Sequence, residues 1–137
     1  MDKASNICLA MKKLQKEQRI LSEMDIDFQF ICSLQKFDTI PFMLFTNDSQ
    51  KPFSAFFNCI KTSFFRLEKL DEETCCALLT LLEPVDMDGC PVDSHEDVFS
   101  LRKTKECIIV VLNCFCAINP LPLALVNKPL PIIEPKC

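Results

Sequence analysis

Residues 52–67, PFSAFFNCIKTSFFRL, carry the clearest periodic pattern in the chain. The large apolar residues of this stretch recur at intervals of three and four positions: Phe53, Phe56, Phe57, Ile60, Phe64 and Leu67. Such spacing places apolar side chains on one face of a helix. Pro52 stands at the first turn, where a helix tolerates proline. The stretch therefore predicts an amphipathic helix that packs an aromatic face into a core.

The flanking sequence extends this interpretation in both directions. Apolar residues at helical spacing, with Asp27, Asp71 and Ser94 as capping residues, predict further helices over residues 4–23, 27–37, 71–83 and 94–119. Residues 40–45 fit either a short strand or one helical turn, and the β-branched residues 108–111 keep a buried strand as an alternative. The expected fold class is all-α: a compact bundle of about five antiparallel helices, with a HEAT- or armadillo-like arrangement as one form.

The end of the chain differs in composition. Five of its nine prolines lie within residues 120–135, which excludes a regular helix or a central strand there. We expect residues 1–119 to form the helical domain and residues 120–137 to form a Pro-rich, apolar, extended tail, docked on the domain or on a partner. An apolar tail that stops abruptly also suggests a piece of a longer protein.

Composition excludes several classes of function. A length of 137 residues fits one domain, and a net charge of −4 argues against nucleic acid as the main partner. The chain has a single glycine, Gly89, so it lacks a P-loop, a dinucleotide-binding fingerprint and a nucleophile elbow. Tryptophan and tyrosine are absent, which disfavours a carbohydrate-active enzyme.

Ten cysteines fit either a secreted disulfide scaffold or a reduced intracellular protein. Several of them lie in apolar segments, where cysteine serves as a small core residue, and lysines near the N-terminus interrupt any signal-peptide pattern. These features predict reduced thiols and an intracellular location, in the cytoplasm or the nucleus.

Residues able to perform chemistry are few. Cys90 and His95 are close in sequence, but a zinc site would need two distant thiols such as Cys76 and Cys137. The acidic loop around Gly89 lacks the carboxylates that an EF-hand requires at both ends. A Cys-His-Asp set drawn from the same loop has nothing to build an oxyanion hole. We therefore predict no enzyme activity, no catalytic residue, no metal and no cofactor, with a zinc-stabilised domain as a lesser alternative.

Residues 107–126 form an uncharged run long enough to span a membrane, and three basic residues precede it. Asn113, Asn119 and a Pro-x-Pro within the run disfavour a span, because they would leave backbone groups unsatisfied in lipid. A membrane-anchored protein therefore remains only a lesser alternative.

The expected function is that of a non-catalytic interaction module. We predict a scaffold or adaptor, a subunit of a larger complex, that buries Phe/Leu-rich helix faces against another protein or against the remainder of a longer chain. The candidate partner-binding residues are Phe42, Phe45, Phe65, Leu121, Leu123, Leu125, Leu130 and Ile132. The alternative is a small helical groove-type regulator of signalling or cell death that binds an amphipathic peptide.

Overall fold

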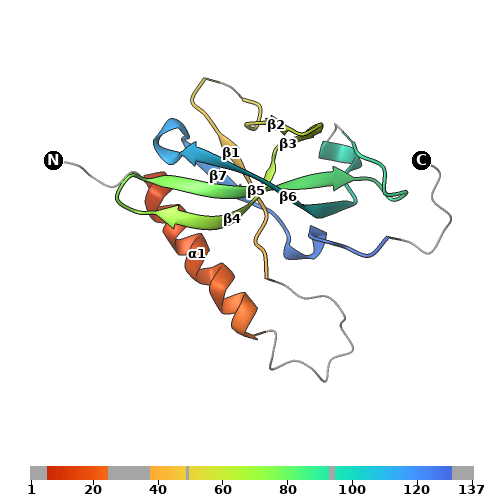
Figure 1. Cartoon of the computed structure of the whole chain (residues 1–137), viewed down its shortest axis with the longest axis horizontal. Helices are drawn as coiled ribbons and strands as arrows, with labels where there is room; N and C mark the ends of the chain where they lie inside the picture. The colour runs from red at the N-terminus through yellow and green to blue at the C-terminus, as the bar shows by residue number, and fades with distance from the viewer. Residues whose placement is uncertain (1–5, 25–37, 49, 93–94, 131–137) are drawn as a thin grey trace.

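A computed structural model describes residues 6–24, 38–48, 50–92 and 95–130, and their main element is a five-stranded antiparallel sheet (Figure 1). The strand order is β6-β5-β4-β1-β7. The strands are β1 (Phe42–Phe45), β4 (Phe64–Asp71), β5 (Cys76–Val85), β6 (Ser100–Val111) and β7 (Ala117–Pro120). Short strands β2 (Ala55–Phe57) and β3 (Ile60–Thr62) pair separately as a hairpin. The α-helix of the described residues is α1 (Asn6–Met24), and short 3-10 turns are η2 (His95–Asp97), η3 (Leu112–Cys114) and η4 (Leu123–Leu125).

The prediction of an all-α bundle is therefore wrong. The stretch 52–67, expected to be one helix, instead contains β2, β3 and the start of β4. Between β2 and β3, Asn58 and Cys59 both have positive φ, 50° and 66°, as a tight two-residue hairpin requires. The hairpin turn interrupts the alternation of apolar residues that a single strand would show. The apolar residues of the stretch therefore recur at three and four positions, which is also the spacing of one face of a helix.

The two later predicted helices are also strands. Residues 71–83 hold the β4–β5 turn and most of β5, and residues 94–119 hold η2, β6, η3 and part of β7. In β5, Leu79 and Leu81 belong to one core cluster while Leu82 belongs to the other. Successive side chains of a strand point to opposite faces, so a strand buried on both sides looks apolar all round, as a buried helix does. The strand alternative for residues 108–111 is confirmed, because they lie in β6.

Two other expectations about elements have a definite outcome. The helix predicted over residues 4–23 is confirmed as α1, and the strand alternative for residues 40–45 is confirmed as β1. The helix predicted over residues 27–37 lies outside the described residues.

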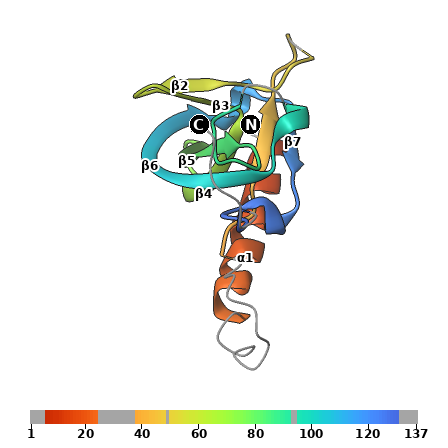
Figure 2. The same ribbon diagram turned by 90° about the vertical axis from the view of Figure 1, so that its right-hand side faces the viewer.

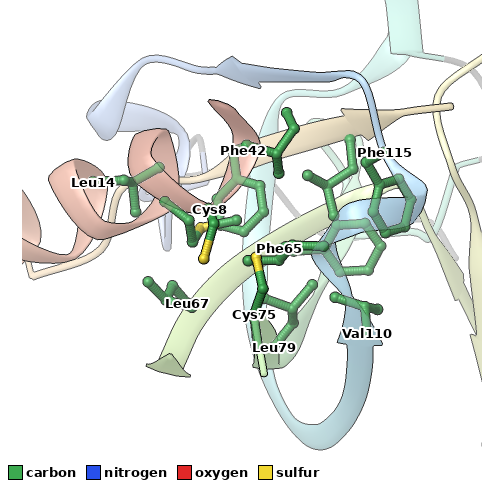
Figure 3. Packing of buried hydrophobic residues seen from close by; sticks show 14 of the residues in the cluster. Cys8, Leu14, Phe42, Phe65, Leu67, Cys75, Leu79, Val110 and Phe115 are labelled. Carbon is green, nitrogen blue, oxygen red and sulfur yellow. The ribbon is translucent and has the colours of Figure 1, made fainter. Parts of the chain in front are cut away.

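The main core lies between α1 and one face of the sheet (Figures 1 and 3). Side chains of the first half of α1 contact β4, η3 and β7, and they share one core cluster with residues of β1 and β5. In that cluster Phe53 stacks on Phe65, with 5.8 Å between ring centroids. The ring of Phe115 meets Phe53 edge-on at 5.2 Å. The helix, the central strands and the segment after β6 are therefore joined in one cluster.

The side chain of Gln18 attaches α1 to the sheet at mid-helix. Its Nε2 donates to the carbonyl of Leu67 at 2.9 Å, and its Oε1 accepts from the amide of Ile40 at 3.0 Å. Beyond this point the last turns of α1 project past the strands (Figures 1 and 2).

The opposite face of the sheet carries a smaller core of Phe64, Leu82, Leu101 and Val126. Residues 120–130 run along this face: the amide of Leu121 donates to Pro41 at 2.8 Å, and Val126 bridges to Leu101. Pro120 ends β7, an edge strand, which is where a sheet accepts proline. The predicted boundary at residue 119 between a domain and a tail stays a prediction.

Among the described residues no helix has both the length and the apolar character needed to cross a membrane. The uncharged run 107–126 passes through β6, η3, β7 and η4.

Candidate functional site

Strand β6 forms one edge of the sheet, and among the described residues most of that edge is open. Its inner side pairs with β5, while the segment at Val126 and Asn127 covers the outer side of its first residues. There the amide of Asn127 donates to Leu101 at 2.7 Å, and Asn127 Oδ1 accepts from the amide of Lys103 at 3.3 Å. From residue 104 to residue 111, no strand in the described ranges pairs with the outer side. An open edge of this length is a template for pairing with another strand.

The same strand exposes an apolar face. Ile109 is 74% exposed and Val111 is 47% exposed, and Cys107 also lies at the surface. The register pairs Ile109 with Leu78 and Val111 with Cys76, and directly paired residues share one face of a sheet. We name these five residues, Cys76, Leu78, Cys107, Ile109 and Val111, the β6 patch. The patch lies on the face opposite α1, because the alternate residues Ala77, Leu79 and Val110 pack in the main core.

A network of charged side chains separates the β6 patch from the smaller core. Arg66 forms an ion pair with Glu68 at 2.5 Å, and its Nε donates to Thr39 at 2.8 Å. Lys103 Nζ contacts Asp38 Oδ1 at 2.8 Å. The network joins β4 and β6 to the segment before β1, so these charges are already partnered within the protein.

Two carboxyl groups of this network have pKa values below their usual range. Burial of Asp38 opposes its ionisation, but hydrogen bonds from Lys103 and Thr39 and the charge of Arg66 outweigh that effect and lower its pKa. For Glu68, burial is likewise outweighed by hydrogen bonds from Thr80 and Arg66, so its pKa is also lowered. Both groups are therefore held as carboxylates, and their ion pairs have a structural role.

The acidic loop between β5 and β6 forms a turn stabilised by its own side chains. Asp86 Oδ1 accepts from the amides of Asp88 at 2.9 Å and Cys90 at 3.0 Å, and Gly89 takes a φ of 83°. A surface pocket of about 460 Å³ lies between this turn and residues 96–99. Within the described ranges, no three His, Cys, Asp or Glu side chains are placed to hold a metal.

The cysteines depart in one position from the prediction of reduced thiols. Cys90 is disulfide-bonded, which contradicts that prediction at this residue and removes the thiol that a zinc site or a Cys-His-Asp set there would need. The side chain of His95 lies outside the described residues. Thiols are present at Cys8, Cys59, Cys75, Cys76, Cys107, Cys114 and Cys116, and four of these, at positions 59, 107, 114 and 116, are exposed.

The predicted partner-binding residues lie in several places. Phe42 and Phe65 are fully buried and contact each other, with ring centroids 6.3 Å apart. Leu121 and Leu125 pack against the smaller core, and Phe45 and Leu123 are half-buried. Leu130 is exposed, and Ile132 lies outside the described residues. The assignment of these eight residues to a partner interface stays a prediction.

Sequence reasoning missed Ile109 and Val111 as surface residues. Four consecutive aliphatic residues at 108–111 suggest burial of all four. In an edge strand, however, alternate residues face opposite sides, so Ile108 and Val110 face the core while Ile109 and Val111 face outward. The alternative prediction of a strand at residues 108–111 could have identified them, because alternate side chains of a strand point to opposite faces.

Two comparisons with known proteins agree. The family model described as "Spore coat protein Z" matches residues 17–122. A curated relative, spore coat protein Z of Bacillus subtilis (strain 168), is 41% identical over 104 residues, covering 66% of this chain and 68% of the relative. No solved structure matches the chain.

These matches correct the functional predictions that rested on a helical fold. A spore coat family contradicts the predicted helical scaffold or adaptor, and it contradicts the predicted cytoplasmic or nuclear location. The alternative prediction of a groove-type regulator is also wrong, because it depended on a helical fold. The family model spans most of the chain, and the relative shares two-fifths of the aligned residues, so the chain belongs to the spore coat protein Z family.

Proposed function

We propose that this chain is a non-catalytic structural subunit of the spore coat, and that it assembles by pairing the open edge of β6 with the same edge of a second copy. The observation that carries the mode of assembly is that the edge at residues 107–111 is unpaired among the described residues and also exposes the aliphatic side chains of Ile109 and Val111. Membership in a coat protein family supports the structural role and the assembly with other coat proteins.

The sequence of β6 favours antiparallel pairing with itself. Residues 107–111, CIIVV, carry no charge and are mostly β-branched, and such residues suit a paired strand. If Ile109 of one copy lies opposite Ile109 of the other, Cys107 meets Val111 and no charged residue falls within the paired segment. The basic residues Arg102, Lys103 and Lys105 then lie outside it.

The covered half of β6 directs pairing to the open half. Asn127 caps the backbone of Leu101 and Lys103, and natural sheets use lysine along an edge to discourage pairing. The side chain of Asn58 reaches Glu106 Oε2 at 2.8 Å, so the β2–β3 hairpin lies beside the middle of the strand. The proposed interface therefore begins after Glu106.

Some of the predicted partner-binding residues have side chains at the surface and could contribute a second contact. Leu123 lines a shallow depression of about 370 Å³ together with Ile20, Leu21 and Ile40. We propose this depression and the exposed Leu130 as a second, smaller contact in the assembly. The pairing of β6 does not depend on it.

The test substitutes Ile109, which is exposed enough for a lysine to remain in water without unfolding the subunit. Ile109→Lys places a charge at the centre of the proposed interface in both copies. Burying an isoleucine contributes on the order of 1.5–3 kcal/mol, so we expect the dimer Kd of the full chain to rise at least about tenfold. Sedimentation equilibrium in a reducing buffer measures that constant without contributions from disulfides.

The matched control is Leu9→Lys. Leu9 is 54% exposed on α1, on the other side of the sheet, and the substitution introduces the same charge. We expect this variant to associate as the parent does. Equal weakening by both substitutions would show a general effect of charge, and an unchanged Kd for Ile109→Lys would contradict pairing through β6.

A further inference from the structure

Two buried cysteines from distant parts of the chain meet inside the main core. Cys8 lies in the first turns of α1, and Cys75 is the last residue of the turn between β4 and β5. Both side chains are more than nine-tenths buried, and their thiols are hydrogen-bonded to each other. Figure 3 shows the side chains of Cys8 and Cys75 beside each other within the cluster.

The backbone holds Cys75 firmly in this position. Its φ of 56° directs the chain out of the turn and into β5, and its carbonyl accepts from the amide of Leu112 at 2.9 Å. The opposite wall is the buried face of α1, where Ile7, Met11 and Leu14 pack on the sheet. A link between the two cysteines would therefore join the helix to the sheet near the end opposite Gln18.

We propose that Cys8 and Cys75 are a modification site: on oxidation they form an intramolecular disulfide that fastens α1 to the β4–β5 turn. The oxidant is a low-molecular-weight disulfide. One cysteine thiolate attacks it, forming a mixed disulfide and releasing one small thiol. The second cysteine attacks the mixed disulfide and releases the other small thiol, so two cysteines are oxidised and one disulfide is reduced to two thiols.

The environment of the two cysteines makes this reaction slow while α1 is packed on the sheet. Burial, followed by the hydrogen bond and the electrostatic effect of Cys75, raises the pKa of Cys8 to about 11. The attacking species is the thiolate, which is scarce at neutral pH when the pKa is so high. Oxidation should therefore follow transient release of α1, and the disulfide would then retain the helix.

The experiment equilibrates the full chain with oxidised and reduced glutathione, with and without a low concentration of urea that speeds opening of the helix. After alkylation of remaining thiols, peptide mass mapping identifies the linked residues. We expect a Cys8–Cys75 peptide to form, faster in urea, and the Tm to rise by on the order of 10 °C because the link closes a long loop.

Cys76→Ala and Cys75→Ala form a matched pair of variants, because the two residues are adjacent but Cys75 packs in the main core, whereas Cys76 is the half-buried first residue of β5 and lies outside that core. Cys76→Ala should retain both the linked peptide and the oxidative rise in Tm, and Cys75→Ala should lose both. Mapping of the parent protein needs no substitution, so it remains informative if Cys75→Ala folds poorly. Linkage of Cys8 to another cysteine, or no linkage at strongly oxidising ratios in urea, would overturn the proposal.

Discussion

Asn58 and Cys59 form the two-residue connection of the β2–β3 hairpin, and their positive φ values make the second position suited to glycine. Because an L-residue is strained in this region, Cys59→Gly should raise the free energy of unfolding by about 0.5–1 kcal/mol, after allowance for the entropy that glycine adds to the unfolded chain. Urea denaturation in a reducing buffer measures the change.

Cys107→Gly provides the opposite case. Cys107 is also exposed, but it lies inside β6, where glycine has no conformational advantage. We expect this variant to lose about 0.5–1 kcal/mol of stability. A shift of both variants in the same direction would contradict the turn geometry assigned to Cys59.

The same turn explains why the hairpin was not predicted. The usual sequence signal is Asn-Gly or Asp-Gly between two alternating runs, and here the second residue is cysteine. The chain has one glycine, so a search for turns by glycine finds almost none of them. The prediction of Asp71 as a helix cap is wrong: its carboxylate accepts from the amide of Glu73 at the β4–β5 turn, and a strand follows.

Among the elements, α1 depends on Gln18 for its polar attachment to the sheet. Gln18→Met keeps the side-chain length but removes the hydrogen bonds to Leu67 and Ile40, leaving buried backbone groups without these partners. The expected loss is about 2–3 kcal/mol. Chemical denaturation measures it, and hydrogen exchange should show that amides of α1 lose more protection than those of β5.

Gln15→Met is the control, since Gln15 lies on the same helix and is half-buried. We expect a change within about 0.5 kcal/mol for this variant. If both substitutions cost the same, the effect would belong to helix composition and not to the docking contact of Gln18.

Elements differ in how far the sequence could predict them. The helix α1 is amphipathic over its whole length, with many charged residues on its outer side, so its period is unambiguous. Strands β4 and β5 are buried on both faces in part, and periodicity cannot separate such a strand from a buried helix. The twelve phenylalanines of the chain were a signal for strands, because aromatic residues favour them.

At the scale of the whole molecule, the candidate surface could not be predicted before the sheet order was known. The exposure of Ile109 and Val111 follows from the place of β6 at the edge, and strand order depends on contacts between distant segments. The pairing of Cys8 with Cys75 has the same origin. Composition correctly indicated many apolar residues in a small chain, but it could not say which of them reach the surface.

The ion pairs around Arg66 make the stability of the whole molecule depend on pH. Asp38 and Glu68 have lower pKa values in the folded protein than their ordinary 3.8 and 4.5. Their contribution is therefore fully present above the unfolded pKa values, and it is lost as the pH falls through the folded ones. Thermal denaturation across the acid range should show stability falling from about pH 4.5 downward.

Arg66→Met tests the origin of that dependence. Without the guanidinium group, Glu68 loses a hydrogen bond and a neighbouring positive charge, so its pKa rises; the pKa of Asp38 rises less, because Lys103 and Thr39 remain beside it. The variant should be less stable than the parent at pH 7, and the two stability curves should converge at low pH, where both carboxyl groups are protonated. Arg102→Met is the control, because the side chain of Arg102 is more exposed than that of Arg66, and an ion pair of an exposed arginine contributes little. Its curve should run parallel to that of the parent, whereas a parallel curve for Arg66→Met would show that this network does not carry the acid sensitivity.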